Sequence, residues 1–272
     1  MSLAEQSKSK SLFQLGQATV WISYCYRKTM LDYCRLENRN NRSDVLMDFV
    51  RRIEANSTGI RSLVETSIEG DSTPYLKLPI GLLLRACIVD SIQGLYLSTL
   101  SAEDCEESIR KFDQDYVLSL ADRFEVYEDR FTKESVLTPM LRTIYGSSIE
   151  DAFPKYIDWS RIDHESKYFC IKKNKRESIS SMAKAIKSVD QYKNLSSKLY
   201  GYYRKYSQYE HFSQMGHGDS LVPFDEDSPS IAKAYEYISE AALEIVKNIG
   251  RPDVSLMEMS RAVKQIRELC NS

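Results

Sequence analysis

The stretch Leu78–Leu100, LPIGLLLRACIVDSIQGLYLSTL, is mostly apolar and long enough to be taken for a membrane span. Arg85 and Asp90 lie near its middle, however, and charged side chains are costly in hydrocarbon. A helix that is apolar on most sides is typical of the centre of a soluble helical protein. We therefore predict a central core helix over 79–100. We also expect Arg85 and Asp90 to be largely buried and hydrogen-bonded, as a pair that fixes the helix register.

The composition agrees with a protein built from long helices. The chain has 272 residues, of which only 10 are Gly and 7 are Pro. So few turn-forming residues argue against a many-stranded sandwich or barrel. Hydrophobic residues make up 42% of the chain, which is enough to bury a sizeable core and argues against global disorder. We predict an all-α, multi-helix bundle.

Helical periodicity and capping signals place the other elements. Ser101 and Asp104 resemble a capping box that opens a long amphipathic helix reaching Phe131. Ser228 followed by Pro229 predicts a helix start, and Gly250–Pro252 predicts its end. The remaining helices are expected at about 11–36, 44–68, 178–188, 192–212 and 253–270.

We expect a single helical domain over 1–272. Helices within 11–70 would pack on a core bundle over 75–250, followed by a C-terminal helix at 253–270. The stretch 144–176, which contains Gly, Pro and Trp, has no clear periodicity and is predicted to be an irregular insertion.

Several classes of function leave no trace in the sequence. No two cysteines have zinc-knuckle or redox spacing, and there is no His-Glu-x-x-His pair, Walker loop or nucleophile elbow. We therefore expect no metal and no cofactor. The N-terminus lacks the apolar core of a signal peptide, so we expect a cytoplasmic protein that does not bind a membrane.

Charge is unevenly distributed, which is the first indication of a partner. Lys167–Lys205 carries eleven basic residues against two acids, or +9, whereas Ser101–Arg130 carries −6. In one interpretation the two segments are neighbours whose charges complement each other, or simply solvated faces. In the other, the basic segment binds an anion such as RNA, with interleaved tyrosines as stacking platforms. Those tyrosines are Tyr168, Tyr192, Tyr200, Tyr202 and Tyr203.

One pair of residues in this region suggests chemistry. Arg204 and His211 are seven residues apart, which is about 20° short of two full helical turns. Both would then lie on one helix face, roughly 10 Å apart along the axis. A His can move the proton of a 2′-hydroxyl or a leaving group, and an Arg can stabilise the negative phosphorane formed in metal-free RNA cleavage.

This arrangement resembles the HEPN superfamily of helical nucleotide-binding domains. In that family four to six residues separate an Arg from a His late in the domain, and one more core helix follows; here six residues separate Arg204 from His211. The stretch 203–213, YRKYSQYEHFS, is also similar to an uncharacterised bacterial helical family. The resemblance extends over about 75–250. Lys205 stands where active HEPN members usually carry a small polar residue.

The resemblance implies a metal-independent endoribonuclease whose Arg–His pairs meet across a homodimer interface. Arg204 would be the phosphate clamp and His211 the acid–base group, with Tyr206 and Ser207 lining the site and Lys184 and Lys187 binding substrate. The alternative is a non-enzymatic helical module that binds a partner protein or a small anionic ligand. In that case Leu195, Leu199, Tyr202, Tyr206 and Tyr209 are a core stripe, and His211 is a satisfied buried histidine.

Overall fold

A computed structural model describes most of the predicted helices. The residues that it describes are 15–18, 20, 24, 26–34, 40–69, 76–112, 177–208, 224–249 and 253–271. This part of the chain is almost entirely helical and contains no strand, which confirms the all-α prediction.

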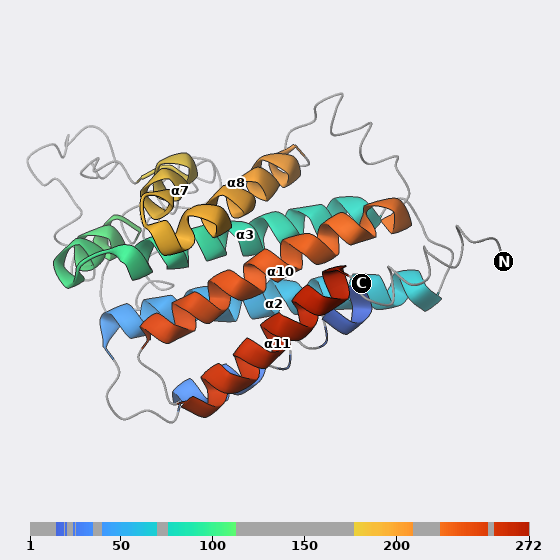
Figure 1. The fold of residues 1–272 in the computed structure, drawn as a ribbon, viewed down its shortest axis with the longest axis horizontal. Helices are drawn as coiled ribbons and strands as arrows, with labels where there is room; N and C mark the ends of the chain where they lie inside the picture. The colour runs from blue at the N-terminus through green and yellow to red at the C-terminus, as the bar shows by residue number, and fades with distance from the viewer. Residues whose placement is uncertain are drawn as a thin grey trace, which may run out of the picture. The chain divides into compact units, whose positions relative to one another are not determined.

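The helices agree closely with the predicted ranges. In chain order they are α2 (Asn41–Glu69), α3 (Lys77–Thr99), α7 (Ile179–Lys187), α8 (Lys193–Ser207), α10 (Phe224–Asn248) and α11 (Asp253–Asn271), with the short 3₁₀ turn η3 (Asp190–Tyr192) before α8. Figure 1 shows them as the coloured ribbons of the bundle. The capping box also forms, because Ser101 Oγ accepts a hydrogen bond from the Asp104 backbone N–H at 3.1 Å.

The stretch 78–100 forms the centre of the bundle, as predicted. α3 packs against α2, α7, α8 and α10 (Figure 1), and its exposed apolar side chains, Leu78 and Leu82, lie in its first two turns. Ile80, Leu84, Ile88, Ile92 and Leu95 are fully buried. Among the described helices, α3 alone is long and apolar enough to span a bilayer, and most of its apolar window is covered by protein.

The two charges of α3 do not form the predicted pair. Asp90 has 0% of its side chain exposed, and its ion-pair partner is Arg52 of α2, with Nη2 and Oδ1 2.9 Å apart. Arg85 is only half-buried and turns towards α8 instead. The reason is geometric: five residues advance a helix by about 500°, which leaves the two side chains about 140° apart.

α10 also begins earlier than predicted. Its first residue is Phe224, so Pro229 lies inside the helix rather than at its first position. A proline near the start of a helix removes a single backbone hydrogen bond. The predicted end of this helix at Gly250–Pro252 is confirmed, since α10 ends at Asn248 and α11 begins at Asp253.

The chain divides into two compact units, 1–105 with 178–272, and 106–177. All helices named above lie in the first unit. Within the second, Lys111 Nζ donates to Glu177 Oε1 at 3.0 Å. The predicted insertion at 144–176 and the continuation of the helix to Phe131 lie outside the described residues.

Candidate functional site

The helix that carries the predicted Arg is built to present one face to solvent. In α8, Leu195, Leu199 and Tyr206 are buried and face the bundle, where α8 packs against α3 and α10. Their spacing at i, i+4 and i+11 is that of a single helix face. The opposite face, which includes Gly201 and Arg204, is therefore exposed.

α7 presents its lysines in the same way. Ser178 caps the helix by accepting a hydrogen bond from the Ser181 backbone N–H, and Met182, Ala183 and Ile186 are buried. Lys184 and Lys187 consequently point away from the core and are exposed. The buried Ser196 Oγ of α8 donates to the Ala183 carbonyl of α7 at 2.7 Å, which holds the two helices together.

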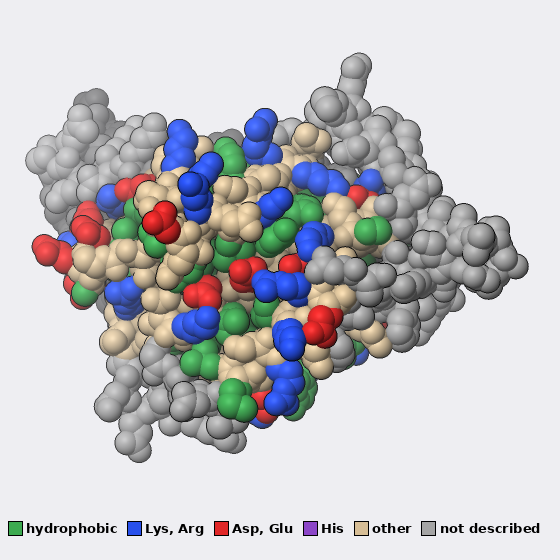
Figure 2. Space-filling model, viewed as in Figure 1, with side chains coloured by type: hydrophobic (Ala, Val, Ile, Leu, Met, Phe, Trp, Pro, Cys, Tyr) green, Lys and Arg blue, Asp and Glu red, His purple; other side chains and the backbone are tan. Residues whose placement is uncertain are grey.

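Five cations on these two helices form what we call the basic face. Each is exposed, and none of their side chains makes a hydrogen bond or an ion pair with another residue in the described part of the chain. Figure 2 shows basic side chains gathered over α7 and α8. The basic face consists of Lys184, Lys187, Lys193, Lys198 and Arg204.

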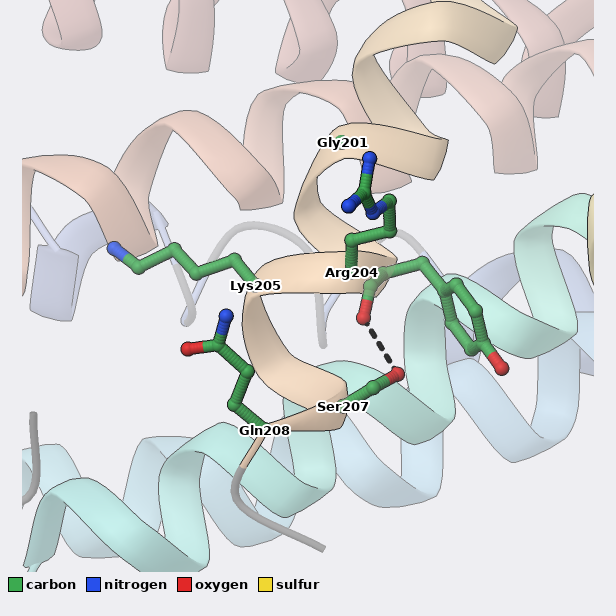
Figure 3. A pocket seen from close by; sticks show the side chains of 6 residues that line it. Gly201, Arg204, Lys205, Ser207 and Gln208 are labelled. Atoms are coloured by element: carbon green, nitrogen blue, oxygen red, sulfur yellow. Dashed lines mark hydrogen bonds between the residues drawn. The ribbon is translucent and has the colours of Figure 1, made fainter. Parts of the chain in front are cut away.

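A pocket of about 510 Å³ lies on the C-terminal half of α8. Figure 3 shows the Arg204 side chain running back along the helix towards Gly201, as helical side chains usually do. The pocket is lined by Gly201, Tyr203, Arg204, Lys205, Ser207 and Gln208. Of these, the sequence predicted Arg204 and Ser207 as site residues and Tyr203 as a stacking platform, and it marked Lys205 as a departure from the family pattern, but it did not indicate Gly201 or Gln208. Gly201 and Gln208 are at −3 and +4 from Arg204, and helical spacing from that residue would have found them.

Lys205 differs from the basic face because it has partners. Its Nζ donates to Asp227 Oδ1 at 2.7 Å and to Ser230 Oγ at 2.8 Å, both on α10. The other oxygen of Asp227 lies 3.7 Å from Nζ of the buried Lys77 on α3. This charge therefore ties α8 to α10.

Two of the residues that line the pocket are held from the central helix α3. Ser207 Oγ donates to the Tyr203 carbonyl at 2.7 Å, the bond drawn in Figure 3, and accepts a hydrogen bond from Arg85 Nε at 3.3 Å. The Arg85 guanidinium also lies 5.6 Å from the centre of the Tyr203 ring, a cation–π contact. Arg85 thus orients two pocket residues from a helix 122 positions away, a link that no short motif contains.

The tyrosines separate into core and surface groups. Tyr192 and Tyr206 are buried, whereas Tyr200, Tyr202 and Tyr203 are half-buried. The rings of Tyr200 and Tyr203 stack with centres 5.9 Å apart. Burial raises the pKa of both Tyr192 and Tyr202 above the usual value for tyrosine. Tyr168 lies outside the described residues.

The predicted site residues are therefore only partly brought together. Arg204 and Ser207 share the pocket, and Lys184 and Lys187 lie on the neighbouring helix. Tyr206 is 1% exposed and belongs to the core rather than to the pocket lining. His211 lies outside the described residues, so the Arg204–His211 pair stays a prediction.

Two further observations concern metal binding and similarity to known proteins. Within the described residues, no three His, Cys, Asp or Glu side chains come close enough to hold a metal ion. No protein-family model, curated protein or solved structure matches the chain.

Proposed function

We propose that this chain is a HEPN-like protein that binds RNA through its basic face and cleaves it without a metal. The observation that carries the proposal is the basic face itself, whose five cations are exposed and make no side-chain ion pair in the described part of the bundle. Lysines and arginines that neutralise phosphates release condensed counterions, and this release is the main source of affinity for a polyanion.

The surroundings of the basic face favour a nucleic acid. Tyr200 and Tyr203 are half-exposed beside Arg204, and aromatic rings at the edge of a cationic surface can contact unpaired bases. α7 and α8 are joined by a buried hydrogen bond, so the cations stand on a rigid support. A rigid support lowers the entropic cost of binding.

Cleavage would rest on Arg204 and His211. His211 would remove the proton of a ribose 2′-hydroxyl, whose oxygen attacks the adjacent phosphorus while the bond to the 5′-oxygen breaks. The proton returns to the leaving 5′-oxygen, and the products are a 2′,3′-cyclic phosphate and a 5′-hydroxyl. Arg204 would stabilise the negative charge on the phosphorane. The family resemblance adds a homodimer, in which two such pairs meet.

Binding is tested by charge reversal. Lys184→Glu with Lys187→Glu should weaken binding of a single-stranded RNA and reduce the salt dependence of its affinity, because phosphate contacts are lost. The matched control is Arg261→Glu with Lys264→Glu, two exposed residues of α11 outside the basic face. If both double variants bind as the wild type does, the basic face is not an RNA site.

Cleavage is tested with EDTA present. The wild-type protein should still cut RNA and leave cyclic-phosphate ends, and His211→Ala should slow cleavage by roughly 10²–10⁴-fold without lowering the melting temperature. A His211→Ala protein that melts earlier, together with no cleavage by the wild type, would instead assign His211 to the core.

The pocket supports a second candidate, a non-enzymatic module for a small anionic ligand. The pocket is open to solvent and lined by a single helix, and Arg204 and Gln208 supply hydrogen-bond donors to it. In that case small phosphate esters should raise the melting temperature of the protein, and RNA should show no salt-dependent affinity.

A further inference from the structure

Gly201 occupies a position that does not require glycine. A Cβ built at this residue would meet no heavy atom within 4 Å, and the residue lies in the regular helix α8. Gly94 of α3 is different, because a Cβ there would lie 2.5 Å from Ile245 Cδ1 of α10. Glycine inside a helix costs roughly 0.5–1 kcal/mol relative to alanine. Packing explains Gly94 but leaves Gly201 unexplained.

The neighbours of Gly201 on the helix surface are donors. On a helix the nearest side chains are three and four positions away. For Gly201 these are Ser197, Lys198, Arg204 and Lys205. Lys198 and Arg204 belong to the basic face, whereas Lys205 is bound to Asp227.

The missing side chain leaves open space beside a guanidinium. Gly201 lines the pocket, and Figure 3 shows Arg204 extending along α8 towards it. Because no atom lies within 4 Å of the Cβ position, the guanidinium does not fill that space. A group that entered there would contact the helix surface with Lys198 one turn before it and Arg204 one turn after it.

We propose that the open space at Gly201, which we call the seat, binds a backbone phosphate of RNA between Lys198 and Arg204. This inference rests on the proposed function and names its substrate contact as a phosphodiester rather than a base. Glycine allows the close approach, since any side chain at this position would occupy the space that the phosphate needs. A phosphate contact carries no sequence information, so the seat would fix the position of the strand without reading it.

The test uses two substitutions that favour helix and fill the space, Gly201→Ala and Gly201→Leu. Both should raise or preserve the melting temperature, because alanine and leucine are better helix formers than glycine. Affinity for a single-stranded RNA should fall about threefold for Gly201→Ala and about tenfold for Gly201→Leu, with a smaller salt dependence. Ala55→Leu adds similar bulk to an exposed position of α2 and should leave RNA affinity unchanged.

The outcomes separate this inference from the proposed function. If charge reversal of Lys184 and Lys187 weakens RNA binding but Gly201→Leu binds as the wild type does, the seat is wrong and the basic face stands. If neither has an effect, the proposed function fails. A fall in melting temperature for both Gly201 variants would assign the glycine a structural role and overturn the seat.

A third arm distinguishes RNA from free phosphate. If the seat needs a nucleic acid strand, free phosphate does not bind at Gly201. Inorganic phosphate at matched ionic strength should then change the melting temperatures of the wild type and of Gly201→Leu by the same amount. Stabilisation of the wild type alone, with no change in RNA affinity for Gly201→Leu, would assign the space to a free phosphate and overturn the RNA contact.

Discussion

α3 and α8 both carry charged residues, but they use them in opposite ways. In α3, Asp90 and Lys77 are buried and each is paired with a charge from another helix, Arg52 or Asp227. In α8, Lys198 and Arg204 are exposed and have no charged partner among the described residues. Buried charge must be compensated within the fold, whereas exposed charge contributes little to stability and remains available for a partner.

The comparison also applies to two neighbouring arginines of α2 and the acids that they pair with, one on α3 and one on α2. Arg52 reaches the fully buried Asp90, while the adjacent Arg51 pairs with the exposed Asp48. The two consecutive arginines are both exposed, but the acid that each one pairs with is buried in one case and exposed in the other. Replacing each arginine by alanine and comparing the two losses in the free energy of unfolding measures how burial of the partner acid changes the strength of the ion pair.

The largest effect is expected for Arg52→Ala. Arg52 pairs with the fully buried Asp90 carboxylate, but its own side chain is 62% exposed, so the loss should fall below the about 3–5 kcal/mol that breaking a fully buried pair typically costs. Arg51→Ala removes only a surface pair and should cost no more than about 1 kcal/mol. Urea unfolding of both variants checks this. Equal losses for the two would show that burial of Asp90 is not what makes its pair matter.

Close packing of α3 predicts the next effect. Gly94→Ala places a methyl group 2.5 Å from Ile245 Cδ1 in the fully buried interface with α10. Overpacking of this kind typically costs about 1–3 kcal/mol. Ile245→Val removes the clashing carbon, so the double variant should be more stable than Gly94→Ala alone. A double variant that is less stable than either single one would place the strain elsewhere.

Asp227 pairs with Lys77 of α3 and Lys205 of α8, so its removal should affect both helices. Asp227→Asn removes the carboxylate that lies 3.7 Å from Nζ of the buried Lys77 and should cost about 1–2 kcal/mol in thermal or urea unfolding. It also releases Lys205 from its ion pair beside the pocket. One more available cation should tighten RNA binding and steepen its salt dependence. Weaker binding by a folded Asp227→Asn protein would show that Lys205 needs Asp227 to be positioned.

Local sequence patterns predicted the helices well because those patterns are themselves local. The apolar stretch 78–100 and the capping pair Ser101–Asp104 contain their evidence within a few turns. Partner choice is not local. Asp90 pairs with Arg52 from another helix, and Arg85 reaches Ser207 across 122 positions. Such pairs depend on how helices pack, which periodicity does not encode.

In the candidate site too, local features were predictable from the sequence and the partners of each side chain were not. Helical spacing placed Leu195 and Leu199 in a core stripe, which the structure confirms, but it also placed there Tyr202, which is only half-buried. It assigned Tyr206 two roles, and the structure places this ring in the core. Lys205 follows Arg204 directly in the sequence, yet only tertiary contact with Asp227 distinguishes the two cations.

The smallest expected effect on stability is that of Lys198→Ala and Arg204→Ala, and it decides how α8 is interpreted. Both side chains are exposed and make no side-chain hydrogen bond or ion pair within the part of the chain that the structure describes, so each loss should change the free energy of unfolding by less than about 0.5 kcal/mol. Each should nevertheless reduce the salt dependence of RNA affinity by about one counterion, because one phosphate contact disappears. If RNA affinity falls only in variants whose free energy of unfolding also falls, these cations support the fold. Affinity that falls while stability is unchanged is the behaviour expected of a surface whose charges serve a partner.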